Sequence, residues 1–231
     1  MEKIKLLFVE DDPSFSFIIK GSLELTGMYE VCLASNGKEG LKAYDSFVPD
    51  IIASDIEMPI MDGLQMVQLI RQKNGNIPIV FATGRTSAQD VVEGYRLNVD
   101  NFIKKPFIPE ELDAHIQAIL KRIKERIIIA NNSKEVFLGE YTFNMATHIL
   151  QWHNEKQKMT PREADILWLL YENKNQVVKR SFLLEKLWGI SDFFTSRSLD
   201  VFTTSLRKYL SFDPNIQIET IHREGLKLIF P

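Results

Sequence analysis

The sequence predicts an α/β protein in which a doubly wound, five-stranded parallel sheet is followed by a smaller α+β domain. The first 125 residues alternate short apolar runs with segments whose apolar residues recur at helical spacing. After about residue 134 the pattern changes to short alternating stretches, three helical segments and a closing hairpin. We therefore expect one domain over residues 1–123, a linker over 124–133 and a second domain over 134–231.

Five apolar runs in the first domain are almost continuous, as expected of strands that are buried on both faces of a sheet. They cover Ile4–Val9, Tyr29–Ala34, Ile51–Ser54, Ile77–Ala82 and Asn101–Lys104. Helical stripes lie between and after these runs; two of them are Phe15, Ile18, Ile19, Ser22 and Leu23, and Leu112, Ile116, Ile119, Leu120 and Ile123. Ligands of such sheets bind beyond the carboxyl ends of the strands, so we expect the site of this domain at that edge.

The second domain begins with three short stretches of alternating polarity, 135–138, 141–144 and 149–152, which indicate an antiparallel sheet. Thr160, Pro161 and Glu163 then predict a capping box at the start of a helix. Two further helices are expected over about 181–188 and 196–210, and a hairpin over 216–220 and 226–230. Helices followed by a hairpin predict a winged helix-turn-helix.

Composition narrows the classes of protein. The single cysteine excludes an intramolecular disulfide, which suits a reducing compartment. The first apolar run is too short for a signal peptide and no run is long enough to span a membrane, so we expect a soluble, cytoplasmic protein without a membrane partner. Residues 1–125 have 14 basic and 19 acidic residues, a net −5, whereas residues 126–231 have 14 and 12, a net +2. That asymmetry permits nucleic-acid binding by the second domain.

Polar residues follow four of the five predicted strands. They are Glu10, Asp11 and Asp12 after the first strand, Asp55 after the third, Thr83 after the fourth and Lys105 after the fifth. Several carboxylates in one crevice are costly unless a cation neutralises them, and ligands that are all oxygen favour Mg²⁺. A carboxylate beside Mg²⁺ can attack phosphorus, and a Lys ammonium and a Thr hydroxyl suit the phosphoryl oxygens.

The ordered motifs EDD, D-x-x-MP-x-MDG, ATG and KPF resemble the receiver domain of bacterial two-component response regulators, which has a flavodoxin/CheY-like fold. The resemblance implies that Asp55 is the phosphoacceptor and takes its phosphoryl group from a sensor histidine kinase. It also implies that Glu10, Asp11, Asp55 and the backbone carbonyl of Glu57 hold Mg²⁺. Asp12, which precedes a proline, is expected to cap the first helix instead.

The same resemblance gives roles to residues on the fourth and fifth strands. Lys105 is expected to contact the phosphoryl group, next to a cis bond to Pro106. Thr83 is expected to move toward the phosphoryl group while the switch aromatic Phe102 turns inward behind it. We further hypothesise that Glu57 and Arg85, each two positions after a site residue, approach one another and restrict attacking water.

The second domain resembles the OmpR/PhoB class of winged-helix effector domains, through its TP-x-E helix start, R-x-L-D-V pattern, LRKYL segment and closing hairpin. The resemblance implies that the helix of about 196–210 enters the major groove of double-stranded promoter DNA. The expected phosphate contacts are Arg197, Arg207 and Lys208, and the outward residues Ser198, Val201, Thr204 and Ser205 include the expected base readers. The wing His222-Arg223-Glu224-Gly225-Leu226 departs from the family pattern and keeps only its glycine, which puts wing contacts with DNA in doubt.

The favoured interpretation is a phosphorylation-dependent DNA-binding transcriptional regulator of a two-component system, not an enzyme. We expect it to form a homodimer through the receiver on phosphorylation, and RNA polymerase is a further candidate partner. The resemblance implies that this dimer forms through the fourth helix, fifth strand and fifth helix of the receiver, with charge pairs. Asp100 fits one such position, and His115, where the class commonly has Arg, predicts a weaker or pH-sensitive dimer. The alternatives are an aspartyl-phosphate hydrolase, which typically has a second Asp where Glu57 stands, and a phosphorylation-independent regulator with a degenerate receiver.

Overall fold

The computed structural model describes residues 2–84, 93–132, 135–189 and 193–231. Arg85, and with it the hypothesis of a contact to Glu57, lies outside these residues. The chain forms two compact units, Met1–Ile119 and Leu120–Pro231. The predicted receiver end at residue 123 and the predicted linker over 124–133 remain predictions, and a helix runs through that region to Asn132.

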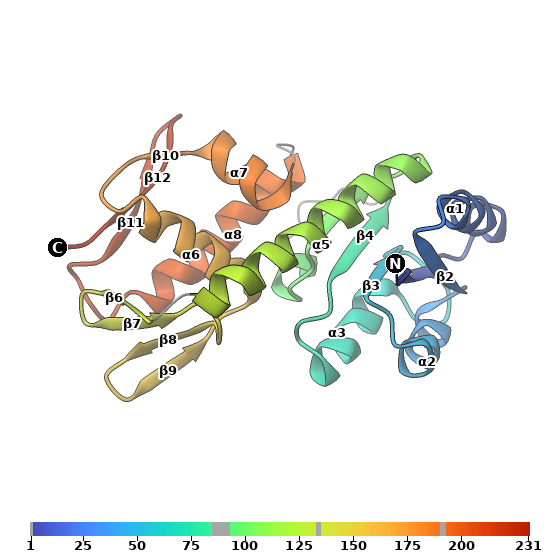
Figure 1. Ribbon diagram of the computed structural model, residues 1–231, viewed down its shortest axis with the longest axis horizontal. Coiled ribbons are helices and arrows are strands. Elements are labelled where there is room, and N and C mark those ends of the chain that lie inside the picture. Colours follow the sequence, from blue (N-terminus) through green and yellow to red (C-terminus); the bar gives the residue numbers. More distant parts are fainter. Residues whose placement is uncertain (1, 85–92, 133–134, 190–192) are drawn as a thin grey trace. The chain divides into compact units, whose positions relative to one another are not determined.

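The first unit is the predicted doubly wound sheet. Five parallel strands have the order β2-β1-β3-β4-β5. The strands are β1 (Ile4–Val9), β2 (Tyr29–Ala34), β3 (Ile51–Ser54), β4 (Ile79–Thr83) and β5 (Asn101–Lys104). The helices are α1 (Pro13–Leu25), α2 (Gly37–Phe47), α3 (Gly63–Lys73) and the first part of α5 (Pro109–Asn132), which continues into the second unit. Figure 1 shows α1 and α5 on one face of the sheet and α2 and α3 on the other. The fold class expected from alternating strands and helices is confirmed.

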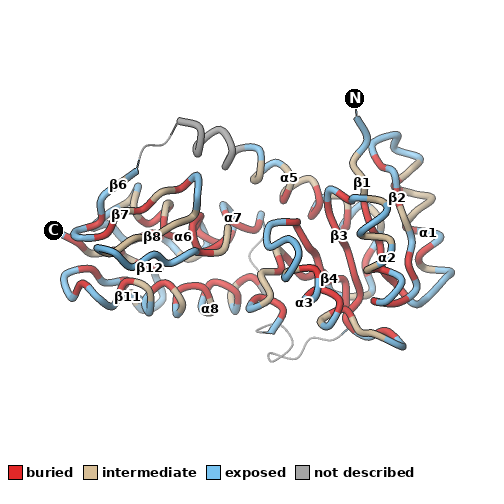
Figure 2. The backbone as a smooth tube through the Cα atoms, turned by 90° about the horizontal axis from the view of Figure 1, so that it is seen from below, coloured by how far each residue is buried: buried red, intermediate tan, exposed pale blue. Residues whose placement is uncertain are grey.

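The core of this unit lies along the central strands, which Figure 2 shows as buried. Every residue of β3 and β4 is buried, as are the last four of β1. This explains why their sequences are continuous apolar runs rather than alternating ones. The fourth strand starts at Ile79, two residues later than predicted, because Pro78 has no N–H to donate to a ladder.

Helix α1 differs from its predicted apolar stripe. Ile19 and Leu23 are buried as expected, but Ile18 is 57% exposed and Ser16 faces inward instead. The Ser16 hydroxyl donates to the carbonyl oxygen of Asp12 at 2.7 Å, which satisfies it inside the fold. The buried face of α1 is therefore rotated from the predicted stripe and includes Ser16, whose hydroxyl is satisfied by a backbone carbonyl one helical turn earlier.

Asp12 caps α1, as predicted. Its Oδ1 accepts from the backbone N–H groups of Ser14 at 2.8 Å and Phe15 at 3.0 Å, and Pro13 begins the helix. We predict that Asp12→Ala costs about 1 kcal/mol of stability, because two N–H groups lose their acceptor. Urea unfolding measures this cost, and Mg²⁺-dependent phosphorylation serves as the control, which is expected to persist. A variant that kept full stability, or lost Mg²⁺-dependent phosphorylation, would contradict the assignment of Asp12 as a cap.

The second unit is an α+β domain with the expected closing hairpin. An antiparallel sheet of β6 (Val136–Leu138), β7 (Tyr141–Asn144), β8 (Ile149–Trp152) and β9 (Glu155–Lys158) comes first. The helices are α6 (Pro161–Glu172), α7 (Arg180–Trp188) and α8 (Phe193–Tyr209). A second sheet, ordered β10-β12-β11, joins β10 (Val178–Lys179) to the hairpin of β11 (Gln217–Ile221) and β12 (Gly225–Ile229). This arrangement confirms the predicted winged helix.

Two local features of this unit follow from single residues. The capping box of α6 is present: Thr160 Oγ1 accepts from the N–H of Glu163, and the Glu163 carboxylate accepts from the N–H of Thr160. Gly225 has no room for a side chain, since a Cβ there would lie 1.9 Å from the carbonyl oxygen of Val178. The wing therefore needs glycine at this one position because β10 and β12 approach closely. Among the described residues, no helix is both long and apolar enough to cross a bilayer.

Candidate functional site

The predicted site residues meet at the carboxyl edge of the parallel sheet. Asp55 N–H donates to the carbonyl oxygen of Val9, and Lys105 N–H donates to that of Thr83, each as the strand pairing ends. The chain turns away at these points, so side chains that follow β1, β3 and β5 converge at this edge.

Three carboxylates form the centre of the site. Ligand oxygens of Glu10, Asp11 and Asp55 all lie within 4.8 Å of one another. Glu10 and Asp55 are buried, whereas Asp11 is exposed. An all-oxygen set with one open side fits a hard divalent cation that keeps part of its water shell. Asp12, the third acid of the run, is not part of this set because its side chain caps α1.

Lys105 lies between the two buried carboxylates. Its ammonium group is 2.6 Å from Glu10 Oε2 and also donates to Asp55 Oδ2. The same ammonium lies over the ring of Phe15, 5.4 Å from the ring centre. The Lys105–Pro106 peptide bond is cis, as expected. The charge of Lys105 thus bridges Glu10, which follows β1, and Asp55, which follows β3.

The protonation equilibria reflect this arrangement. Burial raises the pKa of Glu10 above its ordinary value, although the contacts with Lys105 act in the opposite direction. Burial alone would lower the pKa of Lys105, but hydrogen bonds to Asp55 and Glu10 outweigh burial and raise the pKa. The ammonium is therefore firmly charged and remains available as a cation for an incoming anionic group.

The loop after β3 is built around Asp55. Asp55 Oδ1 accepts from the N–H groups of Ile56 and Glu57, which holds one carboxylate oxygen in place. The loop closes where Gly63 N–H donates to the carbonyl oxygen of Ile56 at 2.9 Å. A Cβ on Gly63 would lie 2.1 Å from the carbonyl oxygen of Asp55, so only glycine permits this close return. The chain thus fixes Asp55 from both ends of the loop.

Thr83 and Phe102 both lie inside the receiver. Each is 1% exposed. The Phe102 ring packs 4.9 Å from that of Tyr95 and 5.5 Å from that of Phe81. The ring of Phe102 is thus buried in this structure, and its expected inward turn on phosphorylation stays a prediction.

His115 does not lie on an exposed dimer surface. It is 9% exposed, and its Nδ1 is 2.7 Å from the amide nitrogen of Asn101. The Asn101 oxygen accepts from the Phe102 N–H, so the amide donates to His115. The position therefore gives no support to a pH-sensitive contact between subunits.

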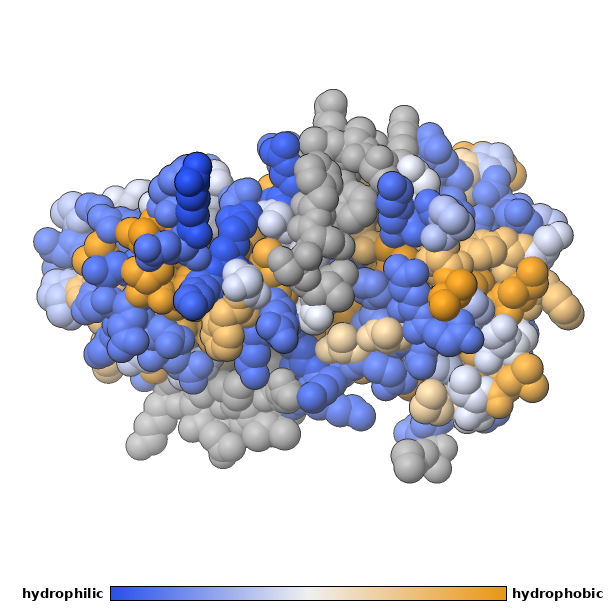
Figure 3. Space-filling view, turned by 90° about the horizontal axis from the view of Figure 1, so that it is seen from above, coloured by the Kyte–Doolittle hydropathy of each residue, from blue (hydrophilic) through white to orange (hydrophobic). Residues whose placement is uncertain are grey.

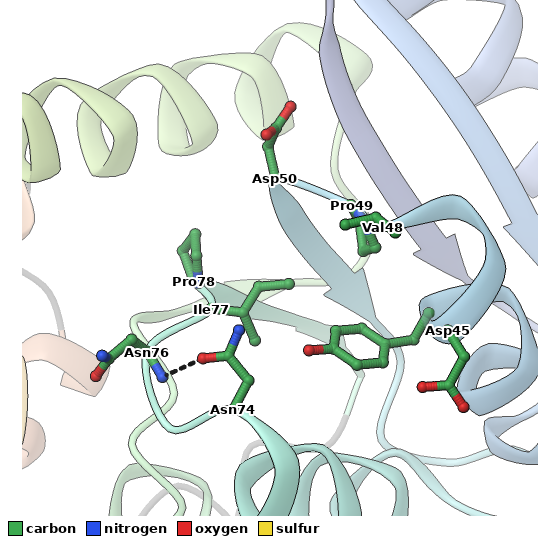
Figure 4. A pocket seen from close by; sticks show the side chains of 9 residues that line it. Asp45, Val48, Pro49, Asp50, Asn74, Asn76, Ile77 and Pro78 are labelled. Atoms are coloured by element: carbon green, nitrogen blue, oxygen red, sulfur yellow. Dashed lines mark hydrogen bonds between the residues drawn. The ribbon is translucent and has the colours of Figure 1, made fainter.

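A surface groove of about 460 Å³ lies at the opposite edge of the same sheet (Figure 4). It is lined by the segments that enter β3 and β4, including Val48, Asp50 and Pro78. Its acids already have partners, since Asp50 accepts from the Lys5 N–H and Asp45 pairs with Lys73. Because the amino ends of the strands face it, this groove is separate from the carboxylate site.

Helix α8 presents most of the predicted DNA contacts. Arg197, Thr204 and Lys208 are exposed, and Val201 and Ser205 are partly exposed. Phosphate contacts need such accessible cations, and Thr or Ser hydroxyls and small apolar side chains on the same face can contact base edges or a thymine methyl group. These five residues remain the candidate nucleic-acid interface.

Two predicted contacts do not fit this interface. Ser198 is fully buried, so its expected outward position is wrong. Arg207 donates from Nε to the carbonyl oxygen of Ile218 at 2.8 Å and from a terminal nitrogen to Thr220 Oγ1 at 2.7 Å. Its guanidinium therefore joins α8 to β11, and we assign it a structural role rather than a phosphate contact.

Sequence reasoning missed Arg180, at the start of α7. This guanidinium donates to Asp200 Oδ1 at 2.8 Å and to the carbonyl oxygen of Ser196. It therefore places a positive charge beside the exposed face of α8 and pairs the one acid on that face, Asp200, among the described residues of the helix. The adjacent Lys179-Arg180 pair at a helix start was the only available signal in the sequence.

Comparison with known proteins agrees with this architecture. The family model "Response regulator receiver domain" matches residues 6–117, and "Transcriptional regulatory protein, C terminal" matches residues 154–228. The transcriptional regulatory protein RprY of Bacteroides fragilis is 36% identical over the whole chain and 96% of its own length. The alkaline phosphatase synthesis transcriptional regulatory protein PhoP of Bacillus subtilis is 31% identical, covering 98% of this chain and 97% of its own.

The fold is also that of a solved structure, response regulator DrrB of Thermotoga maritima, described as an OmpR/PhoB homologue. That likeness has a TM-score of 0.52 at 22% identity and covers 99% of this chain and all of the other. The fold and the site define a receiver-domain transcriptional regulator with a DNA-binding output domain. The chain belongs to the OmpR/PhoB class of two-component response regulators, a family of transcription factors and not of enzymes.

Proposed function

We propose that phosphorylation of Asp55 controls the binding of this regulator to promoter DNA. The observation that carries the proposal is the convergence of Glu10, Asp11 and Asp55 with Lys105 at one open edge of the sheet. A buried carboxylate beside an acidic pair and a bridging ammonium suits a nucleophile toward phosphorus. A structural ion pair alone would not need the third, exposed acid.

Each site residue then has a defined task. Glu10, Asp11 and Asp55, with the backbone carbonyl of Glu57, would hold Mg²⁺, which supplies positive charge to the phosphoryl oxygens. Asp55 is the acceptor, held by the N–H groups of Ile56 and Glu57. Lys105 leaves its carboxylate partners to pair with the new phosphoryl group, and the Thr83 hydroxyl turns toward that group. The inward Phe102 ring then occupies the space behind Thr83.

The donor is a sensor histidine kinase, and the reaction takes place in the cytoplasm. The receiver domain and the DNA-binding domain of the family imply a kinase and DNA as partners. Phosphorylation favours a receiver homodimer that places two winged helices on adjacent half-sites, so effective concentration strengthens DNA binding. Arg197, Val201, Thr204, Ser205 and Lys208 form the DNA-contacting face, and RNA polymerase is a further candidate partner.

Acetyl phosphate or beryllofluoride with Mg²⁺ tests the proposal. With acetyl phosphate we expect uptake of one phosphoryl group in the intact mass. With either reagent we expect a shift toward dimer in analytical ultracentrifugation and roughly tenfold tighter binding to DNA fragments selected from the genome. Omission of Mg²⁺ is the matched control and should prevent all three. Equal DNA binding in both states would instead support a regulator that works without phosphorylation.

A further inference from the structure

Ile60, in the loop that follows the phosphoacceptor, combines two unfavourable features. Its φ is +70°, in the left-handed region that β-branched residues rarely adopt. Its large apolar side chain is nevertheless 79% exposed. A strained backbone and an exposed apolar side chain both lower the stability of the fold. This combination favours a role for Ile60 in contact with another molecule.

The surrounding loop explains why Ile60 is displayed. Gly37 N–H donates to the carbonyl oxygen of Met61 at 2.9 Å, and Met58 is 9% exposed. The loop is also closed at Ile56 and Gly63, next to Asp55. Its flanking residues are thus held to the receiver, and Ile60 lies between them in the loop that follows the acceptor.

Other exposed apolar side chains lie on the segments that leave the same edge of the sheet. Phe17 in α1 is 75% exposed, and Ile108, three residues after Lys105, is 62% exposed. Figure 3 shows apolar side chains at the surface of the receiver unit. An acidic centre with apolar residues on three flanking segments suits a protein surface that covers the site, whereas a small phosphate ester needs only the centre.

We propose that Ile60 is a contact for the phosphoprotein that donates the phosphoryl group to Asp55, and that this contact contributes to the recognition of that donor. The inference rests on the proposed function. In the transfer, the bond from phosphorus to the donor's imidazole nitrogen breaks and a bond from phosphorus to a carboxylate oxygen of Asp55 forms. The imidazole nitrogen keeps the electron pair and takes up a proton. Ile60 takes no part in this chemistry and is a positioning residue.

The chain offers a close control for the strain. Val48 is also β-branched, has a φ of +51° and is 70% exposed, but it lies at the opposite edge of the sheet, beside the groove of Figure 4. Ile60→Gly and Val48→Gly each remove an exposed apolar side chain and relieve the same kind of backbone strain. Only the first removes a side chain from the loop that follows Asp55.

The experiment compares two donors to the full-length protein. One is acetyl phosphate with Mg²⁺. The other is the phosphorylated catalytic part of a sensor histidine kinase. This kinase is chosen, from those encoded in the same genome, as the one that transfers its phosphoryl group fastest to the natural chain. We expect Ile60→Gly and Ile60→Asn to lower kcat/KM for the kinase about tenfold, while the rate with acetyl phosphate stays unchanged. Ile60→Leu, which keeps an apolar side chain, and Val48→Gly should transfer like the natural chain.

Several outcomes would overturn the inference. Kinase transfer to Ile60→Gly at the natural rate would show that the side chain is not a contact. An equal loss with both donors would show that Ile60 only shapes the site around Asp55. If the natural chain took up phosphate from neither donor, the proposed function itself would fail. Melting temperatures of all variants show whether they are folded, and the glycine variants are expected to melt no lower than the natural chain.

Discussion

An Asp55→Asn protein is expected to take up no phosphoryl group from acetyl phosphate and Mg²⁺, and to remain unresponsive in dimer and DNA-binding assays. The amide lacks the anionic oxygen that would attack phosphorus, so no acyl phosphate can form. The amide oxygen can still accept from the N–H groups of Ile56 and Glu57, which keeps the loop in place. The measurement is the intact mass after incubation, with circular dichroism to verify folding.

Asp62→Asn is the matched control, because it makes the same chemical change in the same loop. Asp62 caps α3 through a 2.7 Å hydrogen bond from the Gln65 N–H to its Oδ1. Asparagine is an equally good cap, so stability and phosphorylation should both persist. Phosphate on the Asp55→Asn protein would place the acceptor elsewhere and refute the assignment.

The sequence predicts the receiver fold well because its strands are buried on both faces. Ile4–Val9 and Ile51–Ser54 are strands with the predicted bounds, since short continuous apolar runs between turn residues are typical of the central strands of a parallel sheet. The site follows from the fold, as parallel strands bring Glu10 and Asp55 to one edge although they are far apart in sequence. The cation between them, Lys105, comes from a third strand end in the same way.

The second domain shows where sequence patterns stop being informative. Strand β9, Glu155-Lys156-Gln157-Lys158, has no apolar residue and all four are exposed, so it forms only because β8 pairs with it through a tight turn. Helical spacing placed Ser198 and Arg207 on the outer side of α8. It does not reveal that other parts of the protein bury Ser198 or that β11 binds Arg207. The left-handed conformation of Ile60 was equally hidden, because it is imposed by the loop that closes at Gly63.

A Lys105→Met protein is expected to be less stable than the natural chain by about 2 to 3 kcal/mol near neutral pH without Mg²⁺. Methionine keeps an unbranched side chain but removes the charge that pairs Glu10 and Asp55. Both carboxylates are almost fully buried, so neither can recover its hydration in full. Urea unfolding of the two proteins measures the difference.

The pH dependence of this loss has a definite sign. The pKa of Glu10 is already raised in the folded chain, and loss of Lys105 raises it further. A group with a raised folded pKa stabilises the fold below its ordinary pKa, and that contribution disappears as the pH rises through the folded pKa. The penalty of Lys105→Met should therefore shrink as the pH is lowered from about 7.5 to about 5, because a protonated Glu10 needs no cation.

Two controls test whether Lys105 stabilises the fold by pairing with the carboxylates: addition of Mg²⁺ and substitution of the neighbouring Lys104. Mg²⁺ that binds the folded chain supplies positive charge to the same carboxylates, so it should restore most of the lost stability of Lys105→Met. Lys104→Met removes an exposed charge one residue earlier and should change stability by less than about 0.5 kcal/mol at either pH. A penalty of equal size for both lysines, or one that Mg²⁺ leaves untouched, would mean that Lys105 does not act by neutralising the carboxylate cluster. If the two criteria are met, the ammonium of Lys105 and the divalent cation perform the same electrostatic task on Glu10 and Asp55, which would free Lys105 to pair with a phosphoryl group once the metal is bound.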